Sequence, residues 1–344
     1  MPKTIYRDFD EFAEAINGMA GRIVPTARPE SDWWVQVIPV GRVAMQQVQI
    51  GGAATFAGDG TENALTLGIP VSDSHRIRID GDSMQDNSFV MVKKGQPFTF
   101  AADQATRWTG ITVPMDHASL SPELVESLRS RTWGRRNCTR AQTELPHITR
   151  TKQLILRLCA EDGNVSFLDE AAVISAEDEI VSIASQTLEV SNRPEDGHMG
   201  RPRYSRSLVL ARALALMEES QGQPLFMRDL CRATQVSERT LRNIFQEYFS
   251  VGPTKMMRVR QLGEIRIALL AANQIETSVT AVAARFGVWD FSLLARNYKA
   301  LYGETPSTTL NRPATPRDRH NAMNESWIRF AAHKFQHREW VMSH

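Results

Sequence analysis

Hydrophobic positions recur with two different periods along the chain, and the change of period divides it into two parts. From Trp33 to Pro114, short alternating or apolar runs such as HRIRIDG and FVMVKKGQPFTF are separated by Gly, Pro, Asp and Asn. This pattern predicts closely spaced strands in a sandwich or barrel. From about Ser121 onward, apolar residues recur every three or four positions, which predicts helices, the first of them capped by Ser121.

The stretch QVSERTLRNIFQEYFSVGPTKM, Gln235 to Met256, has the pattern of a short capped helix with Ser237 as its N-cap. Five apolar residues at helical spacing form one buried face: Leu241, Ile244, Phe245, Tyr248 and Phe249. The opposite face carries side chains that hydrogen-bond to bases or phosphates, namely Glu238, Arg239, Arg242, Asn243 and Gln246. With the amphipathic segment Met227 to Thr234 just upstream, this is the sequence form of a helix-turn-helix. The alternative is an ordinary helical hairpin with a solvated charged face.

A second copy of the pattern, Val279 to Pro306, favours the helix-turn-helix. Val236 corresponds to Val288, and then, one residue out of step, three further pairs correspond: Phe245 with Tyr298, Phe249 with Tyr302, and Pro253 with Pro306. The segment between the copies, Thr254 to Ala272, has no helix breaker except Gly263 and predicts a long connecting helix. That helix would hold the two units roughly 34 Å apart, one turn of DNA.

These patterns together predict an α+β fold and four regions. Residues 1–190 form an N-terminal β-barrel or sandwich of cupin-like type followed by helices. Residues 191–203 form a linker, because they contain two prolines, two glycines and five charges without periodicity. Residues 204–312 form an all-α domain with two helix-turn-helix units joined by a long helix. Residues 313–344 form a tail in which ESWIRFAAHKFQHREW predicts one or two amphipathic helical turns.

The net charge of +1 conceals an asymmetry between the two halves. Arg201 to Arg312 contains 16 Lys and Arg against 9 Asp and Glu, a net charge of +7, which leaves −6 for the rest of the chain. Such a division is typical of a basic nucleic-acid-binding module attached to an acidic partner domain. A membrane-binding patch would instead show Lys-rich clusters beside an amphipathic anchor, and the sequence has none.

The C-terminal motifs resemble the DNA-binding domain of AraC/XylS-family transcription regulators. The resemblance covers about 110 residues, Tyr204 to Asn311, and rests on the first copy with its VGP, on RVRQL in the connecting helix, and on the late FG, YK and YGETP. Two departures keep the positions apolar: Val288 replaces the phenylalanine of the usual Gly-Phe pair, and Leu294 and Tyr298 stand where the family more often has Phe. The resemblance implies a bacterial-type regulator that binds promoter DNA and acts on RNA polymerase. It also implies that the N-terminal half senses a small-molecule effector or partner and forms a homodimer.

The resemblance also implies which residues face DNA. In the first copy, Arg239, Arg242 and Asn243 are expected to contact base edges, since arginine pairs with guanine and asparagine with adenine. In the second copy, Asp290 is the expected N-cap, and the outward residues are Phe291, Ser292, Leu293 and Arg296. Residues near helix ends are expected to contact phosphates: Arg228, Thr254, Lys255 and Arg285. Each has an alternative interpretation as an ordinary solvated surface residue.

An alternative function is a catalytic or metal-binding barrel fused to a DNA-binding domain. Before the linker, the only histidines are His75, His117 and His147, without a His-x-His pair, and neither a catalytic Ser-His-Asp set nor a phosphate-binding loop is visible. His333 and His337 have the spacing of a helical metal pair but lack a third ligand. We therefore expect no enzyme activity, cofactor or metal. Six aromatic residues are candidates for either a ligand pocket or plain barrel core: Trp33, Trp34, Phe56, Phe98, Phe100 and Trp108.

Cellular context and assembly follow from the remaining features. Cys138, Cys159 and Cys231 are far apart, which fits a reducing cytoplasm and argues against a disulfide framework. The spacing also counts against a DNA-repair methyltransferase, which needs a clustered cysteine site. No signal peptide is recognisable and no apolar run approaches the roughly 18 residues that span a membrane, so we expect a cytoplasmic protein. An apolar stripe is expected to carry self-association, or else to be intramolecular core: Leu154, Ile155, Leu158, Ile180, Ile183 and Leu188.

Overall fold

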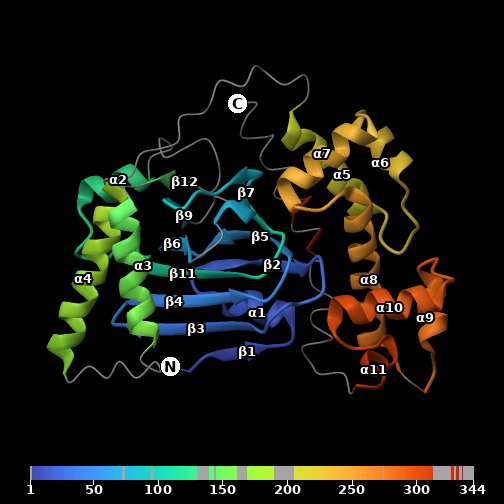
Figure 1. The fold of residues 1–344 in the computed structure, drawn as a ribbon, viewed down its shortest axis with the longest axis horizontal. Helices are drawn as coiled ribbons and strands as arrows, with labels where there is room; N and C mark the ends of the chain where they lie inside the picture. Colours follow the sequence, from blue (N-terminus) through green and yellow to red (C-terminus); the bar gives the residue numbers. More distant parts are fainter. Residues whose placement is uncertain are drawn as a thin grey trace.

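The computed structural model confirms the α+β fold, with strands in the N-terminal part and helices in the C-terminal part (Figure 1). It describes residues 2–71, 74–93, 97–129, 139–142, 145–160, 169–189, 205–273 and 275–312, together with Trp327, Ile328, Ala331, Ala332 and Phe335. The predicted linker 191–203, His333, His337 and Cys138 lie outside the described residues, as does the side chain of Cys159.

Two antiparallel sheets face each other in the N-terminal half. The larger has the spatial order β1 (Thr4–Tyr6), β3 (Trp33–Val40), β4 (Val43–Ile50), β11 (Thr106–Pro114), β6 (Ala64–Pro70), β9 (Ser88–Lys93) and β12 (Thr139–Gln142). The smaller has the order β2 (Met19–Pro25), β5 (Ala54–Gly60), β10 (Phe98–Ala102), β7 (Ile77–Ile79) and β8 (Asp82–Ser83). The predicted strands between Trp33 and Pro114 are confirmed, and β1, β2 and helix α1 (Phe9–Ala15) precede them.

The space between the sheets is filled by apolar side chains from both. Along β9, Val90 and Val92 face this interior while Phe89 and Met91 face the opposite side, as expected for alternating strand residues. Helix α1 contributes Phe12, which is fully buried and packs edge-on against Trp33 with ring centroids 5.0 Å apart. Most of the six aromatic residues belong to this core, and four of them, Phe56, Phe98, Phe100 and Trp108, also line a cavity of about 70 Å³.

Helices cover the outer face of the larger sheet: α2 (Pro122–Arg129), α3 (Leu145–Ala160) and α4 (Glu170–Glu189). Ser121 caps α2, because its hydroxyl accepts a hydrogen bond from the Leu124 amide at 3.1 Å. Ile155, Ile180 and Leu188 are almost fully buried against the sheet. The inference of a self-association surface from this stripe is therefore wrong for these residues, because the sheet and not a second chain covers them.

Glu177 fastens α4 to the sheet. Its Oε1 accepts the backbone N–H of Arg42 at 2.9 Å and lies 2.8 Å from Nε2 of His117, a residue that the sequence analysis considered only as a metal ligand. Gly41, in the β3–β4 turn, has φ +58°, and a Cβ there would lie 1.9 Å from Glu177 Oε2. A glycine is therefore required at this turn for the carboxylate to approach the backbone.

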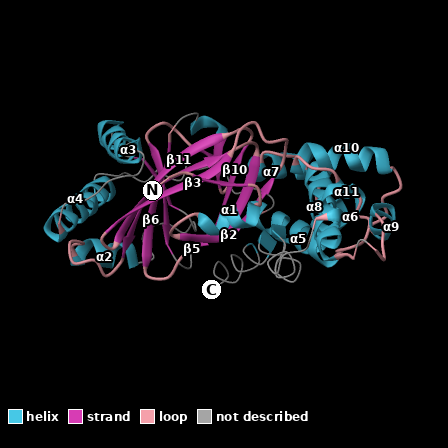
Figure 2. Ribbon diagram, turned by 90° about the horizontal axis from the view of Figure 1, so that it is seen from below, coloured by secondary structure: helices cyan, strands magenta, loops and turns pink. Residues whose placement is uncertain are grey.

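The C-terminal helices are arranged at the two ends of α8 (Pro253–Ala271), the predicted connecting helix (Figure 1). One end carries α5 (Arg206–Glu219), α6 (Met227–Thr234) and α7 (Glu238–Phe249), and the other carries α9 (Val279–Arg285), α10 (Phe291–Tyr302) and α11 (Pro306–Asn311). Each end has its own apolar core. Figure 2 shows these helices at one end of the sandwich and α2 to α4 at the other.

The smaller sheet packs against the first of these helical units. Ala57 of β5 belongs to the core of that unit, and Val24 of β2 packs against it. Gly81, between β7 and β8, has φ +91°, and a Cβ there would lie 3.0 Å from the ring of Tyr248 on α7. The outer face of the smaller sheet is therefore in direct contact with the C-terminal half of α7.

Candidate nucleic-acid interface

Helices α6 and α7 form the first helix-turn-helix unit. Their turn is short because Gln235 adopts the left-handed conformation, with φ 56°, and Val236 is buried beneath it. Ser237 caps α7 as predicted, since its hydroxyl accepts the amide of Thr240 at 3.2 Å. Leu230 and Leu241, one from each helix, are fully buried in the shared core. Buried apolar residues on one side of α7 leave its other side in solvent.

The exposed side of α7 carries the three residues predicted to contact bases. Arg239, Arg242 and Asn243 are all exposed. Arg242 forms an ion pair with Glu238 one turn earlier, and both side chains remain at least half exposed. Because an exposed pair of this kind is worth only about 0–1 kcal/mol, Arg242 can exchange it for a contact with a base at little cost.

Helices α9 and α10 form the second unit, with a longer turn than the first. Asp290 caps α10 as predicted, since its carboxylate accepts the amide of Leu293 at 2.9 Å. In the first unit, Val236 immediately precedes the N-cap Ser237. In the second unit, Trp289 stands between Val288 and the N-cap Asp290. This inserted residue explains why the two copies run one residue out of step in the sequence.

The exposed face of α10 differs from the predicted one in two residues. Ser292, Leu293 and Arg296 are exposed as expected. Phe291, expected to face outward, is instead partly buried and packs against the core of the second unit. Trp289, which the sequence analysis did not select, is 73% exposed. The one-residue offset between the copies is the sequence signal that would have identified it.

The residues predicted to contact phosphates lie near helix ends and are exposed: Arg228, Thr254, Lys255 and Arg285. The guanidinium of Arg228 lies 5.1 Å from the ring centroid of Phe226, itself 53% exposed. Partial burial lowers the pKa of Lys255, because desolvation disfavours the charged ammonium group. An approaching phosphate would favour that charge again.

Two arginines of α8 tie the helix to both units. Arg260 donates from Nε to Glu264 at 2.7 Å and also to the carbonyl oxygen of Ser220, while Glu264 accepts the amide of Gly222 at 3.2 Å. These contacts fix the loop after α5. Arg260 is only 7% exposed, so its charge is satisfied within the domain and it is a structural residue.

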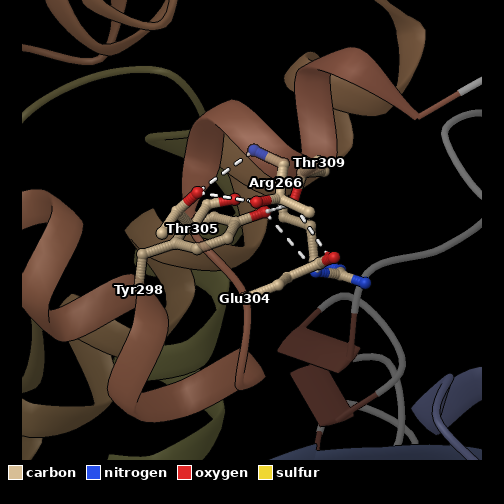
Figure 3. Close-up of polar contacts among 6 residues, drawn as sticks. Arg266, Tyr298, Glu304, Thr305 and Thr309 are labelled. Carbon is tan, nitrogen blue, oxygen red and sulfur yellow. Dashed lines mark hydrogen bonds and ion pairs between the residues drawn. The ribbon is translucent and has the colours of Figure 1, made fainter.

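The second arginine, Arg266, braces the second unit (Figure 3). It donates to Glu304 at 2.7 Å, and the hydroxyl of Thr309 donates to the same carboxylate at 2.9 Å. The hydroxyl of Tyr298, on α10, lies 2.9 Å from that of Thr309 on α11. Burial raises the pKa of Tyr298, which keeps its hydroxyl neutral and able to donate. The network joins α8, α10 and α11.

Among the side chains that the structure describes, no group of three or more His, Cys, Asp or Glu residues is placed to hold a metal ion. In the same part of the chain, no helix is long and apolar enough to cross a membrane. Cys231 is half-buried and packs against the core of the first unit.

The C-terminal part of the chain matches a known helix-turn-helix family and known transcription regulators. Residues 230–312 match a family described as "Helix-turn-helix domain". The chain is 29% identical over 101 residues to the XylDLEGF operon transcriptional activator of Pseudomonas putida, and 28% identical over 102 residues to the probable thc operon regulatory protein of Rhodococcus erythropolis. Each match covers 29–30% of this chain and 31–32% of the relative. A crystal structure of ToxT from Vibrio cholerae aligns with 86% of this chain and 98% of that one, at 11% identity and a TM-score of 0.27.

Proposed function

We propose, from the AraC/XylS type of its C-terminal helix-turn-helix domain, that this protein is a sequence-specific DNA-binding transcription regulator. The observation that carries the proposal is the pair of capped helix-turn-helix units at the two ends of α8. An α-helix of 19 residues is roughly 28 Å long. This length suits two recognition helices that enter successive major grooves, about 34 Å apart.

The two recognition helices would read their half-sites differently. In the first half-site, Arg239, Arg242 and Asn243 hydrogen-bond to base edges. In the second, Leu293 and Trp289 contact thymine methyl groups or sugars while Ser292 and Arg296 supply the polar contacts. Phe291 then acts by holding α10 in place. Phosphate contacts come from the exposed residues at helix ends: Arg228, Thr254, Lys255 and Arg285.

A binding experiment with the whole chain tests this proposal. Duplexes selected from a randomised pool are expected to contain two half-sites about 10 base pairs apart, with an affinity that falls steeply with salt. Replacement of Arg239, Arg242 and Asn243 by alanine should remove selection at the first half-site only. Arg150→Ala, an exposed arginine of α3, is the matched control. Selection of unrelated sequences, or an affinity independent of salt, would contradict the proposal.

We also propose that residues 1–190 sense a small effector in the cavity between the sheets. The cavity is lined mainly by apolar side chains, and its polar lining residues Gln46, Thr66 and Thr109 already hydrogen-bond to backbone oxygens. The indole Nε1 of Trp108, by contrast, is buried without a hydrogen-bond partner among the described residues. A mainly apolar ligand with one hydrogen-bond acceptor fits this arrangement, and the cavity would have to widen beyond its 70 Å³ to admit it.

Thermal-shift measurements against a metabolite panel test the effector proposal. A ligand is expected to raise the unfolding temperature of the wild type and to lose most of this effect in Trp108→Phe, which keeps the ring but lacks the N–H. An equal shift in both proteins would place the ligand elsewhere. As parts of the same proposal, the regulator is cytoplasmic, acts as a homodimer and contacts RNA polymerase.

A further inference from the structure

The described residues of the C-terminal tail form one apolar face. Trp327, Ile328, Ala331, Ala332 and Phe335 are in helical conformation at the spacing of a single helix face, and each is at most 6% exposed. The predicted amphipathic segment is thus confirmed for these residues. They lie beyond the family match, which ends at residue 312, so the helix-turn-helix domain does not account for them.

This face packs against the first helix-turn-helix unit. The Trp327 ring lies edge-on to Phe249, with centroids 5.4 Å apart, and the Phe335 ring lies 6.0 Å from that of Tyr248. Both partners are on the last turn of α7. The tail therefore packs against the C-terminal end of the recognition helix α7.

The same place is where the N-terminal half reaches α7. Tyr248 contacts Phe335 on one side and Gly81, between β7 and β8, on another. Ala57 of β5 shares the core to which the tail residues belong. The tail, the recognition helix α7 and the smaller sheet thus meet at one junction. The ring of Tyr248, on α7, contacts both the tail and the smaller sheet.

A cavity lies beside the junction. Trp327 and Ile328 line a cavity of about 150 Å³ together with residues of α1, β2 and α8 and with Tyr302 of α10. The Nε1 of Trp327 is buried without a hydrogen-bond partner in the described part of the chain. The apolar contacts of the tail residues thus lie beside a cavity that also borders α1, β2 and α8.

We propose that the segment Trp327–Phe335 is an intrachain clamp that holds the first recognition helix against the smaller sheet. The partner of the junction surface is thus this chain's own C-terminal segment. Through the clamp, a displacement of β5, β7 or β10 moves α7, whereas the second unit is braced separately by Arg266. The inference does not depend on DNA binding.

Hydrogen exchange of the whole chain tests the clamp. In Phe335→Ala, amide exchange is expected to rise several-fold both in the C-terminal half of α7 and in β7 and β10, with the second unit unchanged. Ile174→Ala, which truncates a 53% exposed residue of α4, should leave all these segments as in the wild type. An increase confined to α7, or no increase in either place, overturns the proposal, because the segment is then only part of the helical core.

A truncation gives the second arm of the test. A chain that ends at Arg312 should show the same increase, and a peptide of residues 321–344 added in trans should reverse it in both α7 and the smaller sheet. Circular dichroism monitors the fold. Loss of helix content in Phe335→Ala also overturns the proposal, since the segment would then be required for folding of the domain.

Discussion

The two helix-turn-helix units share an architecture and differ in what holds them. In the first, the last turn of α7 packs against the smaller sheet and the C-terminal segment. In the second, Arg266 and Glu304 join α8, α10 and α11 by hydrogen bonds within the domain. The two copies of one architecture are therefore stabilised by different contacts. The end of α7 is held by the smaller sheet and the C-terminal segment, whereas α10 and α11 are held to α8 by a polar network.

The exposed faces of the two recognition helices differ as well. The face of α7 carries two arginines and an asparagine, whereas that of α10 combines Leu293 and the neighbouring Trp289 with a serine and one arginine. Polar base contacts discriminate strongly between bases, whereas apolar contacts mainly detect thymine methyl groups. We therefore expect the first unit to contribute most of the sequence preference. Five predictions test this contrast.

The largest effect is expected from core truncation. Leu241→Ala and Leu294→Ala each remove a side chain that is at most 4% exposed and should each cost about 2–5 kcal/mol of unfolding free energy. Urea unfolding followed by circular dichroism measures this cost. Hydrogen exchange should show that Leu241→Ala loosens β10 more than Leu294→Ala does, because α7 packs directly against β10 and the core of the first unit includes Ala57 of β5. Equal loosening by both variants would erase the distinction between the units.

Arg242→Ala should have the next largest effect. Loss of a bidentate base contact is expected to cost roughly 1–3 kcal/mol on the specific site and much less on a scrambled duplex. Lys255→Ala should instead weaken binding to both duplexes, because a phosphate contact carries no sequence information. Parallel titrations decide between the two roles. If Arg242→Ala lowers the affinity for both duplexes by the same factor, α7 is not the helix that contacts the bases.

Trp289→Ala tests the apolar face of the second unit. Burial of about 50 Å² of indole against DNA, at about 25 cal/mol per Å², gives roughly 1 kcal/mol of affinity. Because no phosphate contact is lost, the dependence of affinity on salt should stay that of the wild type. Affinities measured at three salt concentrations check both statements, with Ile275→Ala, an 88% exposed loop residue, as control. A flatter salt dependence would mean that the residue acts through phosphate contacts.

Tyr298→Phe tests the brace of the second unit. It removes the buried hydroxyl that hydrogen-bonds to Thr309 and should cost about 0.5–1.5 kcal/mol of stability. In this variant Thr309 keeps its hydrogen bond to Glu304, so the loss of stability should stay within this range. Chemical denaturation of Tyr298→Phe measures it, and binding at the first half-site should be unchanged. A weaker first half-site would mean that the brace also orients α7.

The smallest effect concerns pH. The pKa of Lys255 is lowered from 10.5 by burial in the free protein, and a bound phosphate raises it again. The complex therefore holds more protons than the free protein in the alkaline range, and affinity should fall as pH rises through the lowered pKa. Titrations at neutral and alkaline pH detect this change. In Lys255→Arg, which stays charged, this contribution should vanish, and its persistence would assign the pH effect to another group.

The sequence by itself determined the elements and their local chemistry. Ser237 and Asp290 were identified as N-caps because a cap depends only on residues three positions apart. The alternation of strands and the spacing of helices likewise follow from which side chains avoid water, and this produced the duplicated unit and the connecting helix. The strand, helix and strand of residues 4–25 were missed, since the expected sheet began only at Trp33.

Only the tertiary structure decided which face covers which. The stripe containing Ile155 and Ile180 would be equally apolar if a second chain covered it. In the structure the larger sheet covers it. Phe291 packs against the core of the second unit and Trp289 is exposed, although both are large apolar residues near the start of α10. The place of Phe335 depends on Tyr248 and Gly81, far away in the sequence. A local pattern of apolar residues indicates that a surface is buried but does not identify the surface that covers it. The covering surface depends on shapes that exist only after the chain has folded.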